Sequence, residues 1–368
     1  MIKKISKAII FGTFDVIHPG HISIFNYTRK LADKLSIIIA RDKNIEKQTL
    51  FNEQERLANI QKLAIAEQVC LGSLNNPLEF YKKIKPDLVI LGYDQTKYVD
   101  LLKKINITIK RAPVFHPELF KSNKLNKIIN DQQAHFYLIN KNTGSTSFNI
   151  ISTLRKTLNL KKIGFAGTLD PMASGLMILA SGKATKFLDS FHLLNKIYEA
   201  QIELNKTSDT FDAEGIIKNK KVNKKPGKEE IIKLLEKKFT GIILQTPPIF
   251  SAKKINGQKA YNLARKNQEV KLKPVKITVN EIQVLKYNYP FLDLKINCSK
   301  GTYIRSIAND LGKELKTGGV LVKLKRTAIG PFDLKNALAQ EKINLKNLEK
   351  NKLSILEIVK KMNYYFLK

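Results

Sequence analysis

The chain has 368 residues, 43% of them hydrophobic and 26% charged, which excludes wholesale disorder and suggests two or three domains. Its net charge of +33 suits a polyanionic partner, but only 8 of the 65 basic residues are Arg, so a lysine-rich composition is an alternative explanation. Two cysteines exclude a disulfide framework and a cysteine-built zinc site. No apolar run approaches the ~20 residues that span a bilayer, and the N-terminus lacks a signal-peptide pattern, so we expect a cytoplasmic protein with no membrane partner.

Short apolar segments alternate with helical patterns from residue 1 to about residue 130. Leu35–Ala40 is apolar throughout, as expected for a strand buried on both faces of a parallel sheet. Asn52 and Glu55 form a capping-box pattern at the start of a helix. This order predicts a doubly wound α/β domain over residues 1–130. Further strands are expected at Ala8–Phe11, Val69–Leu71, Leu88–Leu91 and Thr108–Arg111, and further helices at His21–Ala32, Leu78–Ile84, Tyr98–Lys104 and, capped by Ser122, Asn123–Ile129.

A polar segment, residues 130–135, is the expected linker to a second domain over residues 135–334. Strands and helices mix there without βαβ regularity, which predicts an α+β fold with a mixed or antiparallel sheet. Glu229–Phe239 and Thr302–Leu315 have helical patterns, and Phe291–Cys298 alternates like a strand. Residues 335–368 are expected to form a short helical tail.

A glycine-containing turn joins the first predicted strand to the first helix, with the sequence Gly12-Thr13-Phe14-Asp15-Val16-Ile17-His18-Pro19-Gly20-His21. The glycines let a ligand approach the backbone, and a helix N-terminus offers free N–H groups to a phosphate. His18 and His21 can donate hydrogen bonds to a phosphoryl group as it gains charge. A tight turn with incidental histidines is the alternative. We expect no protein-built metal site, because no third and fourth ligand follow nearby.

This pattern, Gly-x-Phe-Asp-x-x-His-x-Gly-His, resembles the signature of the nucleotidylyltransferase superfamily, which has a Rossmann-like fold. Ala40–Asn44, Leu91–Gln95 and Lys121–Leu125 are most similar to archaeal-type FAD synthases, and next to glycerol-3-phosphate cytidylyltransferases. Arg111–Phe115 departs from the cytidylyltransferase pattern, which disfavours CTP. The resemblance implies transfer of AMP or CMP from ATP or CTP to a small phosphorylated acceptor, with FMN among the candidates and Mg²⁺ on the triphosphate. A domain that only binds a nucleotide is the alternative.

By this resemblance, His18 and His21 stabilise the transferring phosphoryl group. Asp94 would lie near the nucleotide, and Lys43 or Lys47 would contact phosphate. The full set of implied nucleotide-binding residues is Thr13, Phe14, His18, His21, Lys43, Asp94 and Ser122.

Asp170 lies in a second glycine-containing stretch, Gly164–Gly175, directly before Pro171. Proline disfavours helical geometry for the residue before it, so we expect Asp170 on an irregular loop that presents its carboxylate, with an ordinary Asp-Pro turn as the alternative. Arg305 falls in the first turn of a helix that Thr302 is expected to cap. A cation there opposes the helix dipole by about 0.3–1 kcal/mol, so either Asp170, an RNA phosphate or solvent must stabilise it.

These elements together resemble the TruB family of tRNA pseudouridine synthases, from about Phe136 to Leu334. The matching segments are the Gly167–Pro171 loop, Lys141–Ser147, Gly182–Lys186, Lys196–Tyr198, Gln245–Ala264, Lys300–Arg305 and Leu324–Arg326. The resemblance implies that a flipped-out uridine of the tRNA T-loop, uridine-55, is detached from its ribose, rotated and rejoined through C5, without a cofactor.

By that resemblance Asp170 is the catalytic carboxylate, Arg305 pairs with it, and Tyr198 stacks on the flipped base. Whether Asp170 adds to the ribose, adds to the base or abstracts a ribose proton stays open. The resemblance also implies contacts with RNA for Phe165, Tyr261, Arg265 and Leu324, and for Lys141 either such a contact or a structural role near the Asp170 loop.

The 34 residues after Leu334 are too few for a full PUA domain, which guide-RNA-dependent relatives normally carry. We therefore expect a bifunctional enzyme that binds the T-arm of tRNA without a guide RNA. The alternative is a tRNA-binding or tRNA-folding module attached to an inactive nucleotide-binding domain.

Overall fold

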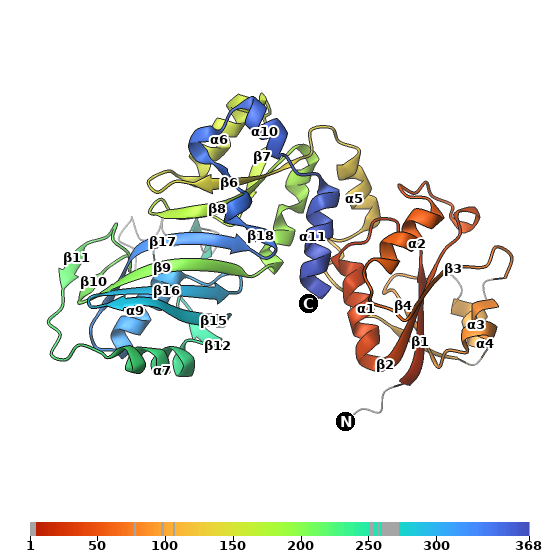
Figure 1. Cartoon of the computed structure of the whole chain (residues 1–368), viewed down its shortest axis with the longest axis horizontal. Coiled ribbons are helices and arrows are strands. Elements are labelled where there is room, and N and C mark those ends of the chain that lie inside the picture. Colours follow the sequence, from red (N-terminus) through yellow and green to blue (C-terminus); the bar gives the residue numbers. More distant parts are fainter. Residues whose placement is uncertain are drawn as a thin grey trace. The chain divides into compact units, whose positions relative to one another are not determined.

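The computed structural model of the chain describes residues 5–76, 79–96, 99–105, 107–249, 254–255, 258–259 and 272–367. They form two compact units (Figure 1). The first unit combines Met1–His135 with Leu353–Lys368, and the second is Phe136–Lys352. The chain therefore leaves the first unit, builds the second, and returns to the first at its C-terminal end.

The described part of the first unit is built on a five-stranded parallel sheet in the order β3-β2-β1-β4-β5, which confirms the predicted α/β fold. The strand order reverses between β1 and β4, and at such a point the carboxyl ends of the strands border a crevice. The strands are β1 (Ile5–Gly12), β2 (Ala32–Ile39), β3 (Gln68–Leu71), β4 (Leu88–Leu91) and β5 (Thr108–Arg111). The helices are α1 (Pro19–Leu31), η1 (Asp42–Asn44), α2 (Glu53–Gln61), α3 (Glu79–Ile84), α4 (Val99–Lys104), α5 (Ser122–Ile129) and α11 (Ile355–Leu367).

Two helix starts in this unit differ from the prediction. Helix α1 begins at Pro19 rather than at His21, with His18 as its extended N-cap. Proline suits the first helical position because its fixed φ is helical and its missing N–H would have no partner there. The predicted cap at Ser122 is wrong, since Lys121 is the N-cap and Ser122 is the first residue of α5.

Helix α11 lies beside α1 and α5 within the first unit (Figure 1). The segment expected to be one helical tail, residues 335–368, is therefore divided. Its first part carries a short strand and α10 (Leu345–Asn351) in the second unit, and its last part is α11. An amphipathic pattern predicts the helix but not which unit covers its apolar face.

The second unit is built, among the described residues, on a ten-stranded sheet with the main order β12-β15-β16-β9-β17-β8-β6-β19. The pairs β17–β8 and β19–β6 are parallel and the other named pairs are antiparallel, which confirms the predicted mixed sheet. The strands are β6 (Phe136–Lys141), β7 (Ile163–Ala166), β8 (Ala173–Ser181), β9 (Lys196–Leu204), β12 (Gly241–Gln245), β15 (Val275–Asn288), β16 (Phe291–Cys298), β17 (Gly319–Ile329), β18 (Phe332–Asp333) and β19 (Leu338–Ala339). Two small hairpins pair β10 (Lys206–Ser208) with β11 (Ile217–Asn219), and β13 (Lys254–Ile255) with β14 (Gln258–Lys259). The other helices are α6 (Ser147–Leu158), η2 (Gly182–Leu193), α7 (Lys228–Lys238), α9 (Ile304–Glu314), η3 (Leu334–Asn336) and η4 (Gln340–Lys342).

Helix α9 packs against β17 and carries Arg305 in its first turn, as predicted. The expected cap is wrong: Tyr303 is the N-cap, and the hydroxyl of Thr302 donates instead to the carbonyl of Ser299 at 3.0 Å. The apolar residues of the helix are buried in the core of the unit, which fixes the helix against the sheet. These residues are Ile304, Ile307, Ala308 and Leu311.

Strand β8 approaches β17 closely at Gly175, which has a φ of +109° and pairs with Arg326. A Cβ atom at Gly175 would overlap the backbone of Arg326. We expect Gly175→Ala to destabilise the second unit by about 2–4 kcal/mol, measured as lost hydrogen-exchange protection in β8 and β17. Gly227→Ala, where a Cβ meets no atom within 4 Å, is the control and should cost less than about 1 kcal/mol. Equal effects of the two substitutions would contradict this account.

Candidate active sites

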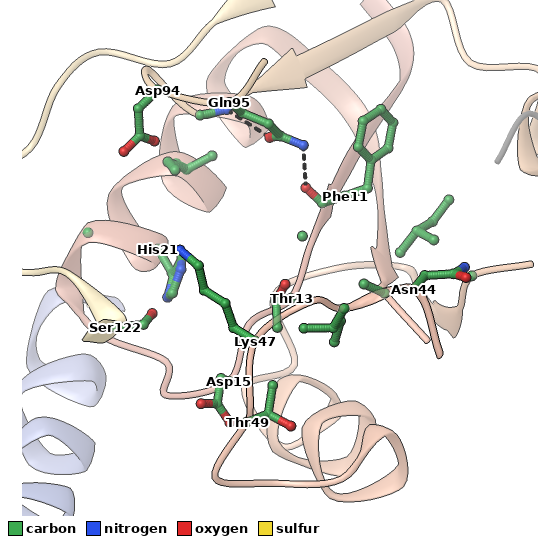
Figure 2. A pocket seen from close by; sticks show the side chains of 18 of the residues that line it. Phe11, Thr13, Asp15, His21, Asn44, Lys47, Thr49, Asp94, Gln95 and Ser122 are labelled. Atoms are coloured by element: carbon green, nitrogen blue, oxygen red, sulfur yellow. Dashed lines mark hydrogen bonds between the residues drawn. The ribbon is translucent and has the colours of Figure 1, made fainter. Parts of the chain in front are cut away.

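A cavity of about 740 Å³ lies at the carboxyl ends of β1 and β4, where doubly wound sheets bind their ligands (Figure 2). Of the two lysines considered, Lys47 lines this cavity, and Lys43 is not among its lining residues. Gln95, in the loop that follows β4, joins this loop to β1, since its Nε2 donates to the carbonyl of Phe11 at 3.3 Å (Figure 2). Five residues predicted to bind nucleotide also line it: Thr13, His18, His21, Asp94 and Ser122.

Phe14 was predicted to contact the nucleotide, and that prediction is wrong. Its side chain is buried in the core of the unit, with its ring centroid 5.3 Å from that of His21 and 5.5 Å from that of Phe25. Its φ of +50° turns the chain sharply after β1. Phe14 therefore packs against the ring of His21 and is not among the residues that line the cavity.

The rings of His18 and His21 stack with their centroids 3.8 Å apart. The backbone N–H of His18 donates to Nδ1 of His21 at 3.4 Å, so the proton of the neutral His21 ring is on Nε2. Burial lowers the pKa of His21 to about 4, and burial followed by the neighbouring His21 lowers the pKa of His18 well below its ordinary value. Both rings are neutral at pH 7, and they can donate N–H groups to a phosphate without carrying a charge.

Two buried side chains that the sequence analysis did not select hold the loops around this cavity. Arg56, on the helix that Asn52 caps as predicted, is fully buried. Its guanidinium donates to the carbonyls of Thr13 at 2.7 Å and Ala40 at 3.0 Å, and forms an ion pair with Asp42.

Asp15 holds the segment before the same helix through backbone hydrogen bonds. Its carboxylate accepts the backbone N–H groups of Leu50 and Phe51 at 2.9 and 3.0 Å. The Asp of the Gly-Thr-Phe-Asp motif is therefore a loop anchor. Its place in the motif was visible, but nothing in the sequence pattern marked its partner segment.

In the second unit, the loop that carries Asp170 is held on both sides. The hydroxyl of Ser147 donates to the carbonyl of Leu169 at 3.2 Å and accepts the N–H of Leu169 at 3.3 Å. The carbonyl of Pro171 accepts the N–H of Gly144 at 2.8 Å. The carboxylate between these anchors is 38% exposed, so the loop presents it as the sequence analysis predicted.

Asp170 and Arg305 form the predicted pair, with Oδ2 and Nε 3.1 Å apart. The Arg305 side chain is only 7% exposed and the Asp170 side chain is 38% exposed. On its other side Arg305 meets Asp212, which is 3% exposed, at 3.3 Å. Asp212 itself accepts bonds from the hydroxyl of Thr210 and the N–H of Glu214. The guanidinium is therefore shared between one accessible and one buried carboxylate.

Sequence reasoning missed Asp212. It lies in the segment Ser208–Gly215, whose Ser, Asp and Thr residues are typical of any polar turn. The hydrogen bonds of this turn bring Asp212 next to β17, where it forms a bridge to Leu321.

Tyr198 and Leu324 lie on neighbouring strands, β9 and β17, in the core that backs Asp170. Burial raises the pKa of the Tyr198 hydroxyl, so this group stays protonated at neutral pH. Arg326, the cross-strand partner of Tyr198, is also buried and donates to the carbonyl of Gly167 at 3.0 Å. Arg326 thus fixes the start of the Asp170 loop, a role that its position in a matching segment did not reveal.

Of the two roles expected for Lys141, the structure has the structural role near the Asp170 loop and not the contact with RNA. The side chain is fully buried, and its ammonium donates to the carbonyls of Asn142, Ser145 and Pro171 at 3.0, 2.6 and 3.3 Å. An ammonium has three donors, so none remains for a phosphate. Lys141 therefore holds the Asp170 loop through the carbonyl of Pro171.

Phe165 is half-buried on β7, and its ring meets the exposed ring of Phe148 edge-on at 6.0 Å. The remaining predicted RNA contacts, Tyr261 and Arg265, lie outside the described residues.

Both units of the chain are similar to known protein families. Residues 155–304 match the family model of the TruB family pseudouridylate synthase N-terminal domain, and residues 9–135 match the cytidylyltransferase-like family. The tRNA pseudouridine synthase B of Clostridium kluyveri is 42% identical over 215 residues, which are 58% of this chain and 73% of that protein. The chain belongs to the TruB family of pseudouridine synthases.

Other TruB-family relatives match to a similar extent. The tRNA pseudouridine synthase B of Protochlamydia amoebophila is 45% identical over 232 residues, covering 62% of this chain and 87% of the relative. That of Opitutus terrae is 41% identical over 223 residues, covering 60% and 92%. The predicted family resemblances of both halves are thereby confirmed, whereas the FAD synthase likeness stays a prediction. None of the helices described in this TruB-family chain is long and apolar enough to cross a membrane.

The low pKa of His21 predicts how the stability of the first unit depends on pH. In the unfolded chain His21 titrates near 6.5, and in the folded unit near 4. The unfolded state therefore binds more protons between these values, so stability should fall as the pH is lowered through this window. His21→Gln should flatten that dependence in thermal unfolding curves. Ring NMR should show a midpoint near 4, and a midpoint near 6.5 would contradict the burial of this ring.

Proposed function

We propose that the second unit converts uridine to pseudouridine at uridine-55 in the T-loop of tRNA, with Asp170 as the catalytic carboxylate. The contact between Asp170 and Arg305 carries this proposal. A carboxylate that is partly exposed and held by a buried cation can reach an RNA base in a fixed orientation. The names of the TruB-family relatives support tRNA as the substrate.

The reaction breaks the bond between C1′ of the ribose and N1 of uracil, and it joins C1′ to C5 after the base has rotated. Flipping the target out of the folded loop costs a few kcal/mol, which contacts with the protein must offset. Asp170 acts on the ribose or on the base in each of the three routes open to it. In all three routes the charge-assisted bond from Arg305 keeps the carboxylate oriented.

We propose that the ring of Tyr198 stacks on the flipped base, with Leu324 closing the apolar wall beside it. The protonated Tyr198 hydroxyl can exchange a proton with the base as C5 loses its hydrogen. Phe165 is proposed to stack on RNA, together with Tyr261 and Arg265. The net charge of +33 supports contacts with T-arm phosphates, and such contacts would make binding strongly salt-dependent. We propose that the chain binds tRNA without a guide RNA.

Asp170→Asn should abolish pseudouridine formation in an unmodified tRNA transcript, with a loss of more than about 10³-fold. The variant should still fold, because Arg305 keeps its contact with Asp212. Mass spectrometry of the transcript measures the product, and filter binding measures the affinity for tRNA.

The matched control is Asp293→Asn, a variant at an aspartate of the same unit that bonds to Gln201 instead. It should retain activity. Full activity of Asp170→Asn would overturn the catalytic role. A wild-type chain that binds tRNA but forms no pseudouridine would favour the tRNA-folding alternative.

We infer that the first unit transfers a nucleotidyl group from a nucleoside triphosphate to a small phosphorylated acceptor. The cavity at the N-terminus of α1 supports this, because its free N–H groups and the neutral rings of His18 and His21 suit a phosphoryl group that gains charge. Phe115 and Phe120 line the same cavity with nearly parallel rings 5.8 Å apart. These rings suit a flat aromatic acceptor such as FMN, with ATP as the donor.

Magnesium fits this site as an ion that is bound to the triphosphate of the substrate. No three His, Cys, Asp or Glu side chains converge on a metal position within the described ranges. Asp94, at the cavity, is largely exposed and has Lys121 at 3.7 Å. One carboxylate is enough for Mg²⁺, which keeps several waters and binds substrate phosphates. Bound there, the ion would neutralise charge on the departing pyrophosphate.

Incubation of the full chain with ATP and FMN should yield FAD and pyrophosphate, whereas CTP with glycerol 3-phosphate should react more slowly. His21→Ala should reduce the rate by about 10²-fold, because it removes a donor to the transition state. His192→Ala, in the other unit, should have no effect on this reaction. Absence of product from both substrate pairs would leave the first unit as a nucleotide-binding module.

A further inference from the structure

Helix α11 makes two hydrogen bonds to the part of the first unit that carries the histidine pair. The side-chain amide of Asn363 donates to the carbonyl of Ile17 at 2.8 Å. The side-chain amide of Asn26, on α1, donates to the carbonyl of Phe366 at 3.0 Å. The last helix of the chain is thus joined both to α1 and to the turn that precedes it.

The carbonyl of Ile17 belongs to the same peptide group as the N–H of His18. That N–H donates to Nδ1 of His21, so one planar peptide is held between Asn363 and His21. A rotation of this plane would break the bond to His21, and with it the bond that keeps the His21 proton on Nε2. The amide of Asn363 therefore acts on His21 through a single rigid group.

A row of aromatic rings forms a second connection between α11 and the histidines. Phe366 meets Phe115 edge-on at 6.0 Å, and Phe115 stacks on Phe120 at 5.8 Å. Phe120 in turn lies nearly parallel to the ring of His18 at 6.2 Å. This row therefore links α11 to His18, whereas His21 is linked to α11 through the peptide before His18.

The chemistry of Asn363 also indicates a positioning role. Its side chain is buried, and its Oδ1 has no hydrogen-bond partner in the described part of the chain. An unsatisfied buried acceptor destabilises a fold, whereas an apolar side chain of similar size would not. The bond to Ile17 is the one contribution of this amide that an apolar residue cannot replace.

We propose that α11 contributes to the nucleotidyl-transfer site. In this proposal Asn363 is a positioning residue that sets the geometry of His18 and His21. This inference rests on the proposed function of the first unit. Residues beyond the pseudouridine synthase unit thus complete the site that begins at Gly12.

The test compares Asn363→Leu with Lys361→Ala, an exposed position on the same helix, in the full chain. The chain has five histidines, so their ring signals can be assigned by NMR. Asn363→Leu should shift the signals of His18 and His21, leave that of His192 unchanged, and weaken ATP binding by about 3- to 10-fold, the equivalent of one hydrogen bond. Pseudouridine formation should not change, and Lys361→Ala should alter none of these readouts.

Unchanged His18 and His21 signals in a folded Asn363→Leu chain would overturn the inference. If that variant loses the fold of the first unit, Phe366→Leu decides instead, since it removes only the aromatic edge and should still shift the His18 signal. Failure of the wild-type chain to bind ATP would overturn the proposed function, but the ring signals would still decide whether α11 positions the histidines.

Discussion

The candidate synthase site depends on how one buried guanidinium is shared. Arg305 is almost completely removed from water, and a buried cation without a partner would cost several kcal/mol. Asp212, equally buried, neutralises it on the inner side, while Asp170 approaches from the accessible side. Two carboxylates therefore share one guanidinium, and of the two Asp170 is the one exposed enough for RNA to reach. Because Asp212 stabilises Arg305, Asp170 is available for chemistry and not needed for the fold.

The first unit uses a buried arginine differently. Arg56 directs most of its donors to main-chain carbonyls, so it fixes the backbone of loops and offers nothing to a ligand. A planar guanidinium can do this because its five donors point in fixed directions, which a lysine cannot match. The groups in that unit that line the cavity and can donate to a phosphate are the neutral rings of His18 and His21. In both units a buried arginine holds a loop or a carboxylate at the candidate site.

The sequence was most informative where chemistry depends on local spacing. The Gly12–His21 turn, the Asp170 loop and the first-turn position of Arg305 could all be predicted, because each is set by residues adjacent in the chain. Contacts between distant segments could not be predicted in this way. Asp212 looked like part of a polar turn, and only the pairing of its turn with β17 brings it to Arg305.

Burial is the other quantity that residue type does not show. Lys141 has the positive charge expected of a residue that contacts RNA, but three carbonyls accept hydrogen bonds from its buried ammonium. Phe14 occupies a motif position, but its positive φ turns the ring into the core. Lys43 and Lys47 are indistinguishable in the sequence, and the path of one short loop decides which of them lines the cavity. Predictions of residue role failed where the side-chain direction depended on the packing of the whole unit.

The return of the chain to the first unit has a consequence for how that unit forms. Residues 1–135 leave the ribosome first, but Ile17 and Asn26 obtain their partners only when Asn363 and Phe366 have been made. At about 5–20 residues per second, that interval is about 10–50 s. The parallel sheet can form during this time, because its strands all precede residue 112. The peptide before His18 then lacks its hydrogen bond from α11 until Asn363 has been made, so this link to the histidine pair follows the synthesis of every strand of the sheet.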